Sequence, residues 1–320
     1  MTTLSGSVDF TQTRNEIVTD ALTLCGAIGE GETPGSAMNA AAVRQLERMI
    51  KHWQGQGIHI WSRRHAVLYV TPSQVSYDLG TSSTDHATEE SDAVRTTLGA
   101  DASTGATSLT VSSITGIAAS DEIGVVLDDD TFQWTTVSGS PTGTTVGLAA
   151  SLTGAASSGN YVHSYTTDLA RPLKIIDAQW RNEPDSLDIP VEMLSDEEYY
   201  SLPNKANTGE TVEAYYHPKI SSDLGKIYLW PVPNTVDRTL RLTCLMPLQD
   251  FDSSGNNADF PTEWLDCLVW NLAKRLLPNY GASGRASAQE IIQGGTTMLN
   301  EMLGWDQEPA SVFFQPETRR

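Results

Sequence analysis

Neighbouring carboxylates are the residues whose types and spacing come nearest to a catalytic pattern. Glu197 and Glu198 are adjacent, and Asp128-Asp129-Asp130 form a triplet. A glycoside hydrolase needs one carboxylic acid of raised pKa and one ionised partner across a sugar cleft. Simpler explanations exist, because Glu197 and Glu198 follow Ser195 at a helix start, and the triplet falls between two strand-like runs. The sequence therefore predicts no catalytic residues.

Histidines and cysteines form no metal-binding or nucleophilic pattern. The six histidines stand singly, and Cys25, Cys244 and Cys267 are too few and too scattered for a zinc site or a disulfide framework. We expect three buried thiols. The Asp128–Asp130 triplet lacks the glycine and distal glutamate of a calcium loop, and no phosphate loop, dinucleotide fingerprint, Gly-x-Ser-x-Gly or His-Glu-x-x-His motif occurs. These observations predict a protein that is not an enzyme and has no cofactor and no metal.

The C-terminal segment carries the most suggestive binding residues. Trp305, Phe313 and Phe314 are large apolar side chains on a segment that prolines interrupt and that is too short to form a core. Aromatic anchors of this kind supply much of the energy of protein interfaces. Arg319 and Arg320 would add attraction to an acidic surface. We predict that residues 305–320 are a partner-binding tail; the alternative is that the rings fold back on their own domain.

Composition and charge exclude several classes of protein. With 320 residues, of which 39% are hydrophobic, the chain can bury a substantial core, so global disorder is not expected. Its net charge of −20 is spread along the chain without a cluster of basic residues, which disfavours tight nucleic-acid binding. An acidic surface is compatible with DNA that passes without sticking. Neither a signal peptide nor a membrane span is expected.

Periodicity predicts helices at both ends of the chain and strands between them. The first helix begins with the capping box Thr13-x-x-Glu16, and Ser195-x-x-Glu198 opens a short one before Pro203. Two-residue alternation predicts strands elsewhere. The long helices are expected at 13–29, 36–55, 261–277 and 287–304, and the strands at 66–79, 173–180, 211–216, 226–230 and 239–246.

A central segment differs in composition from both sides. Residues 96–170 contain no Lys or Arg, and Ser, Thr, Gly and Ala make up more than half of them. Alternating apolar pairs recur at roughly ten-residue spacing, and Asp128–Asp130 lies where a hairpin turn is expected. This pattern is typical of a small β-sandwich or barrel, with disorder as the alternative.

We therefore predict an α+β protein. Its fold would be a helical core of about four main helices with antiparallel strands, plus an inserted small all-β domain and an extended C-terminal tail. The predicted boundaries are 1–95 and 167–304 for the core, 96–166 for the insertion and 305–320 for the tail.

Several short motifs, in order, resemble a known family. The most informative is Lys226-Ile227-Tyr228-Leu229-Trp230-Pro231-Val232-Pro233, which predicts one arm of an antiparallel pair ended by prolines. The others are 20–26, 31–34, 46–53 with 57, 58 and 61, 71–72 with 77, 194–199, 201–205, 215–218, 246–251 and 271–273. Together they resemble the head-to-tail adaptor of short-tailed bacteriophages, also called the packaged-DNA stabilisation protein or tail accessory factor. The β insertion departs from the smallest members of that family.

The resemblance implies a structural virion protein of the tail or neck, assembled in the host cytoplasm. It would form a dodecamer, a ring of twelve subunits, beneath the portal protein and receive the tail nozzle protein and a tail fibre or tailspike. The ring would extend the DNA channel, retain packaged DNA, and conduct the double-stranded DNA during ejection without sequence-specific binding. Trp305, Phe313, Phe314, Arg319 and Arg320 are then the expected portal-binding residues, and no contact with a membrane is expected.

Two alternatives from other classes stay open at this point. The first is a virion-associated cell-wall hydrolase, in which the neighbouring carboxylates would be the catalytic residues. The second is a carbohydrate- or receptor-binding module formed by the β insertion, in which Trp134, Tyr161 and Tyr165 would stack on sugar rings.

Overall fold

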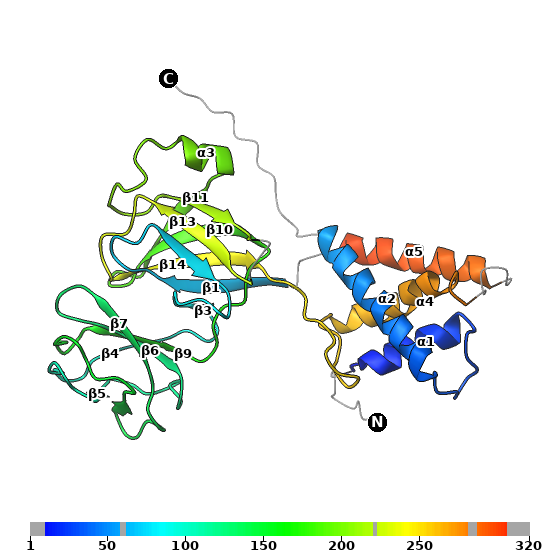
Figure 1. Ribbon diagram of the computed structural model, residues 1–320, viewed down its shortest axis with the longest axis horizontal. Helices are drawn as coiled ribbons and strands as arrows, with labels where there is room; N and C mark the ends of the chain where they lie inside the picture. Colours follow the sequence, from blue (N-terminus) through cyan, green and yellow to red (C-terminus); the bar gives the residue numbers. More distant parts are fainter. Residues whose placement is uncertain (1–9, 58–61, 220–222, 281–286, 306–320) are drawn as a thin grey trace, which may run out of the picture. The chain divides into compact units, whose positions relative to one another are not determined.

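A helical unit built from both ends of the chain and a β unit from its middle make up the protein (Figure 1). The computed structural model describes residues 10–57, 62–219, 223–280 and 287–305. The helical unit comprises Met1–Ser62 and Leu248–Arg320, and the β unit comprises Arg63–Pro247. Each unit has its own hydrophobic core.

Helix α4 is central in the helical unit, since it contacts the other three long helices. Trp264, in a 3₁₀ turn (Thr262–Trp264) before α4, is fully buried and meets the Trp53 ring edge-on at 6.1 Å. Such an aromatic pair adds stability beyond the area it buries. The four long helices are α1 (Arg14–Leu24), α2 (Ser36–Gly55), α4 (Leu265–Leu276) and α5 (Ala288–Trp305).

Local sequence explains where these helices begin and end. Thr13 and Glu16 form the predicted capping box, with the Thr13 N–H donating to Glu16 Oε2 at 2.7 Å. Helix α2 has the predicted bounds and buries one face, which includes Leu46, Met49 and Trp53. Helix α1 ends at Leu24 instead of continuing to Gly29, because Gly26 takes a left-handed φ of 71° that stops the helix.

Two adjacent glycines inside α5 have a packing role. Taken alone, each costs a helix about 1 kcal/mol relative to alanine. A Cβ at Gly294 would lie 2.7 Å from the Trp270 ring of α4, and Asn271 Nδ2 donates to the Gly295 carbonyl oxygen at 2.9 Å. The glycines therefore allow α5 to approach α4 closely.

The β unit contains an eight-stranded sheet of order β2-β13-β12-β11-β10-β14-β1-β3, nearly closed and barrel-like. Every neighbouring pair is antiparallel except β11 and β12, which α3 (Asp196–Ser201) connects. As predicted, β13 is an arm of antiparallel pairs; its partners are β12 and β2. The strands are β1 (Arg63–Tyr69), β2 (Ser76–Leu79), β3 (Ala87–Glu89), β10 (Lys174–Asn182), β11 (Leu187–Met193), β12 (Glu213–His217), β13 (Gly225–Trp230) and β14 (Arg238–Leu245).

Two smaller sheets lie between β3 and β10 in sequence. The four-stranded sheet has the order β4-β9-β6-β7, and β5 pairs with β8. The Asp128–Asp130 triplet joins β6 to β7 in the predicted hairpin, with Asp130 at a φ of 59°. The strands are β4 (Val94–Thr97), β5 (Ser108–Thr110), β6 (Glu122–Val126), β7 (Phe132–Thr136), β8 (Thr145–Gly147) and β9 (Tyr161–Tyr165).

The predicted fold class, a helical core with accessory strands, is wrong. The described residues are mostly β: fourteen strands in three sheets against five α-helices. The reason is that strands predicted as accessories form one large sheet. The apolar face of this sheet buries a core of its own, which includes Leu68, Trp180 and Leu242. Among the described helices none is long and apolar enough to cross a membrane.

Candidate functional site

The predicted tail falls almost wholly outside the described residues. Trp305 is the last residue of α5, whereas Phe313, Phe314, Arg319 and Arg320 lie beyond the described part of the chain. Their role in binding a portal therefore stays a prediction.

The carboxylates that came nearest to a catalytic pattern have structural partners. Glu198 Oε2 accepts from the Ser195 N–H at 2.8 Å and closes the capping box of α3, which lowers the pKa of Glu198. Asp128 Oδ1 accepts from the Ser157 N–H at 2.8 Å and from Asn160 Nδ2 at 2.9 Å, and these bonds lower its pKa. Both carboxylates therefore hold loops and helix ends in place.

All three cysteines are buried, as predicted. Burial raises the pKa of Cys244 and of Cys267 to about 12, so neither is a ready nucleophile. In the described part of the chain, no group of three or more His, Cys, Asp or Glu side chains has the arrangement of a metal site.

A polar face of the eight-stranded sheet brings together residues that the sequence did not connect. Thr239 of β14 pairs with both Tyr69 of β1 and Arg181 of β10, and Arg241 follows Thr239 on the same face. Because strand side chains alternate, the intervening Leu240 lies on the opposite face, in the core. A slip of one residue would bury Arg181 and Arg241, so the apolar face fixes this register.

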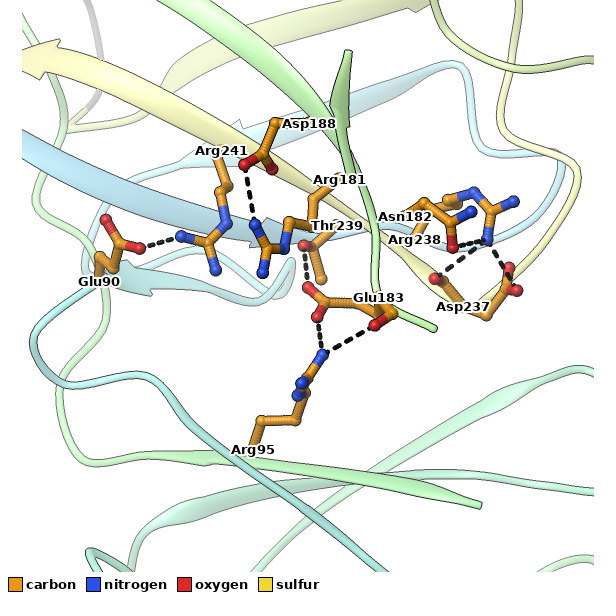
Figure 2. A network of polar contacts seen from close by, with 10 residues as sticks. All are labelled: Glu90, Arg95, Arg181, Asn182, Glu183, Asp188, Asp237, Arg238, Thr239 and Arg241. Atoms are coloured by element: carbon orange, nitrogen blue, oxygen red, sulfur yellow. Dashed lines mark hydrogen bonds and ion pairs between the residues drawn. The ribbon is translucent and has the colours of Figure 1, made fainter. Parts of the chain in front are cut away.

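Three arginines meet carboxylates on this polar face (Figure 2). Arg241 pairs with Glu90, which follows β3, and Arg181 Nη1 lies 2.8 Å from Asp188 Oδ2 of β11. Arg95 of β4 reaches across from the four-stranded sheet to the carboxylate of Glu183, and Arg95 Nη1 also donates to the Glu183 carbonyl oxygen at 3.1 Å.

Glu183 is the most buried charged member of this network. Its side chain is only 6% exposed, and its Oε1 accepts from the hydroxyl of the buried Thr239 at 2.6 Å. Glu183 therefore connects three strands: it directly follows β10, bonds Thr239 on β14 and pairs with Arg95 on β4.

These residues surround a polar hollow of about 220 Å³. Arg95, Arg181, Arg241, Glu90 and Glu183 supply its charged lining, which sums to +1 in a chain whose net charge is −20. A second hollow shares Glu90 and Arg241 with it. The sheet thus presents a local concentration of guanidinium groups on an otherwise acidic protein.

Two buried residues with titratable rings also line this hollow. Tyr69 and His163 are 3% and 4% exposed and both line the hollow. Neither the Tyr69 hydroxyl nor the His163 ring nitrogens form a hydrogen bond within the described residues, and none of these atoms is completely enclosed by protein. Burial raises the pKa of Tyr69, an effect to which Glu183 adds, and burial lowers the pKa of His163 to about 4. At neutral pH both groups are therefore uncharged.

An aromatic cluster flanks the hollow and joins the two larger sheets. The Tyr69 ring stacks on Tyr165 with centroids 6.1 Å apart, and His86 stacks on Trp134 at 3.9 Å. Gly124 allows this packing, because a Cβ there would lie 2.7 Å from the Trp134 ring. The proposed sugar-stacking rings Trp134 and Tyr165 therefore have protein partners, and Arg95 lies over the third, Tyr161, at 5.5 Å.

Motifs that carry the family resemblance meet in a second cluster, around α3, β12 and β13. The Tyr199 ring lies 5.4 Å from Tyr215 and 5.1 Å from Tyr228, and the Tyr215 hydroxyl donates to Asp196 at 2.6 Å. Tyr200 beside them is 60% exposed. Segments 194–199, 215–218 and 227–233 are thus one structural feature.

The sequence alone did not reveal the polar hollow lined by Arg95, Arg181 and Arg241, which we call the guanidinium hollow. Its residues come from β1, β4, β9, β10 and β14 and from the positions just after β3 and β10, between residues 67 and 241, so no single motif joins them. The only signal was local: Thr239 and Arg241 alternate with Leu240 and Leu242 in a half-buried strand.

Comparison of the chain with models of known protein families and with curated proteins gave no match.

Proposed function

We propose that this protein is a head-to-tail adaptor of a short-tailed bacteriophage. It docks as a dodecameric ring beneath the portal protein, extends the DNA channel toward the tail nozzle, helps to retain packaged DNA and conducts it during ejection. The support is the order and spacing of the motifs described above, together with their convergence in space.

The α3 cluster is the observation that carries the proposal furthest. Residues of different motifs, up to 29 positions apart in sequence (Tyr199 and Tyr228), contact one another, and Asp196 and Tyr215 belong to the same cluster. If the short motifs matched only by chance, we would expect them to be scattered over the structure rather than packed together. The motif Thr71-Pro72 with Tyr77 behaves in the same way, since the Tyr77 hydroxyl accepts from the Thr71 N–H and donates to its carbonyl oxygen, both at 2.9 Å.

Charge and the helical unit are consistent with the same role. A net charge of −20 repels a passing duplex and keeps it from adhering to a channel wall. Helix α5 is the last described element of the helical unit and exposes Ile292 and Leu303, and the proposed portal-binding residues Phe313 and Phe314 follow it in the sequence.

The tail provides the test of portal binding. Phe313→Ala combined with Phe314→Ala removes two aromatic anchors, each contributing roughly 1.5–3 kcal/mol when buried. We expect the dissociation constant for a portal ring to rise by about two to four orders of magnitude. The melting temperature of the free chain should stay nearly unchanged. Sedimentation of the complex with a purified portal ring measures the first, and calorimetry the second.

Phe10→Ala is the matched control. Phe10 is 66% exposed on the helical unit and is not part of the tail. Unchanged docking of the tail double variant, or equal weakening by Phe10→Ala, would show that the tail is not the portal-binding arm.

A further inference from the structure

The guanidinium hollow has no part in the proposed docking of the tail, yet it has the features of a binding site. It lies wholly within the β unit, between the polar face of the large sheet and strands β4 and β9. Its volume of about 220 Å³ is below the range of roughly 300–1,000 Å³ that is usual for drug-sized ligands. A ligand of a few heavy atoms would fit.

Hydrogen-bond donors outnumber acceptors in this hollow. Arg95, Arg181 and Arg241 each donate a hydrogen bond to a carboxylate through Nη1. Within the described residues, no hydrogen bond from their Nη2 groups is formed. The Nε atoms of Arg181 and Arg241 are buried without a hydrogen-bond partner as well. Each guanidinium group carries five N–H donors in a fixed fork, which suits the paired oxygens of a carboxylate or phosphate.

Tyr69 and His163 supply two further donors independently of the arginines. Both residues are more than nine-tenths buried and line the hollow, and within the described residues neither the Tyr69 hydroxyl nor a His163 ring nitrogen has a hydrogen-bond partner. A neutral tyrosine and a neutral histidine can each donate one hydrogen bond. A buried donor without a partner costs stability, so a ligand that accepts from both would relieve that cost.

The carboxylate acceptors that line the hollow already accept hydrogen bonds from protein groups. Glu183 accepts from Arg95 and Thr239, and Glu90 accepts from Arg241. The remaining lining groups therefore favour oxygen-rich, negatively charged ligands over cations.

We propose that the hollow lined by Tyr69, Arg95, His163, Arg181 and Arg241 binds a small oxyanion, a phosphate or a carboxylate group. The two large-sheet arginines hold the anion from one side, Arg95 holds it from the other, and Tyr69 and His163 complete its hydrogen bonds. The bound group would connect β4 and β9 to β10 and β14.

The test is a titration of the full chain at constant ionic strength. Inorganic phosphate and malonate, each exchanged against chloride, serve as the two probes, and isothermal titration calorimetry measures the affinity. We expect saturable binding of one ion per chain by at least one probe. Phosphate alone would identify a phosphate site, malonate alone would identify a carboxylate site, and saturation by neither would overturn the proposal.

Tyr69→Phe is the most informative variant, because it removes a hydroxyl that bonds no other group in the described part of the chain, and we therefore expect the fold to stay intact. We expect it to weaken binding about tenfold. Arg181→Gln with Arg241→Gln should abolish measurable binding. Arg44→Gln with Arg48→Gln, two exposed positions on α2, changes the net charge equally and should bind like the wild-type chain. Wild-type affinity in Tyr69→Phe would show that the ion does not accept a hydrogen bond from Tyr69. Equal loss in the α2 control would show general charge attraction. Either result would overturn the proposed site.

Discussion

Replacing Glu183 by alanine is expected to destabilise the β unit by about 2–4 kcal/mol. The carboxylate is 6% exposed and accepts from both Thr239 Oγ1 and Arg95 Nη1. Its loss leaves the buried Thr239 hydroxyl without a partner and releases Arg95, the only basic residue that joins the four-stranded sheet to β10 in the described network. Hydrogen exchange monitored by mass spectrometry should show faster exchange in β4, β9 and β10, while α1, α2 and α4 keep their protection.

Asp188→Ala is the matched control for Glu183→Ala. Asp188 also pairs with an arginine of the network, but its side chain is 36% exposed. Ion pairs in contact with solvent contribute about 0–1 kcal/mol, so we expect a small change. Equal effects of the two substitutions would contradict the structural role assigned to Glu183.

Acidification from pH 6.5 to pH 4 is expected to weaken the β unit through His163 and His86. Burial lowers the pKa of both rings to about 4, against about 6.5 in an unfolded chain. Between these values the unfolded chain binds protons that the folded chain does not, so stability is fully present above pH 6.5 and falls as pH decreases toward 4. The almost fully buried His163 contributes about 3 kcal/mol over that window, and the half-buried His86 contributes less.

His163→Phe isolates this effect. The variant keeps a ring of similar shape among Tyr69, Phe132 and Tyr161 but has no titrating nitrogen. Urea unfolding at a series of pH values should give a slope between pH 6.5 and 4 that is smaller by about one proton than in the wild-type chain. Identical slopes would show that His163 is not held neutral by burial.

Sequence patterns predicted the elements whose causes are local. The capping boxes at Thr13 and Ser195, the bounds of α2 and the hairpin at Asp128–Asp130 all follow from residues within a few positions of one another. Strand β11 was missed because Pro190 interrupts its pattern, although the structure pairs Pro190 with Gln179. The sequence therefore predicted interactions between residues close together in the chain, but it did not predict which strands pair with one another.

The fold class and the hollow depend on such pairings. Nothing in the sequence states that β14 lies between β1 and β10, and this order decides that Tyr69, Arg181 and Arg241 share a face. The same order produces the separate β core that made a helical description wrong. For the same reason Glu183, predicted neither as a core residue nor as a site residue, proved to be the most buried charge of the network.

Assembly on a portal ring tests the proposed adaptor function most directly. Purified full-length chain would be measured by light scattering alone and after mixing with the portal ring of the same phage. The adaptor proposal predicts mostly monomer in dilute solution, since strongly acidic subunits repel one another, and twelve copies bound to each portal ring. Failure of the chain to associate with the portal ring at any ratio would contradict it.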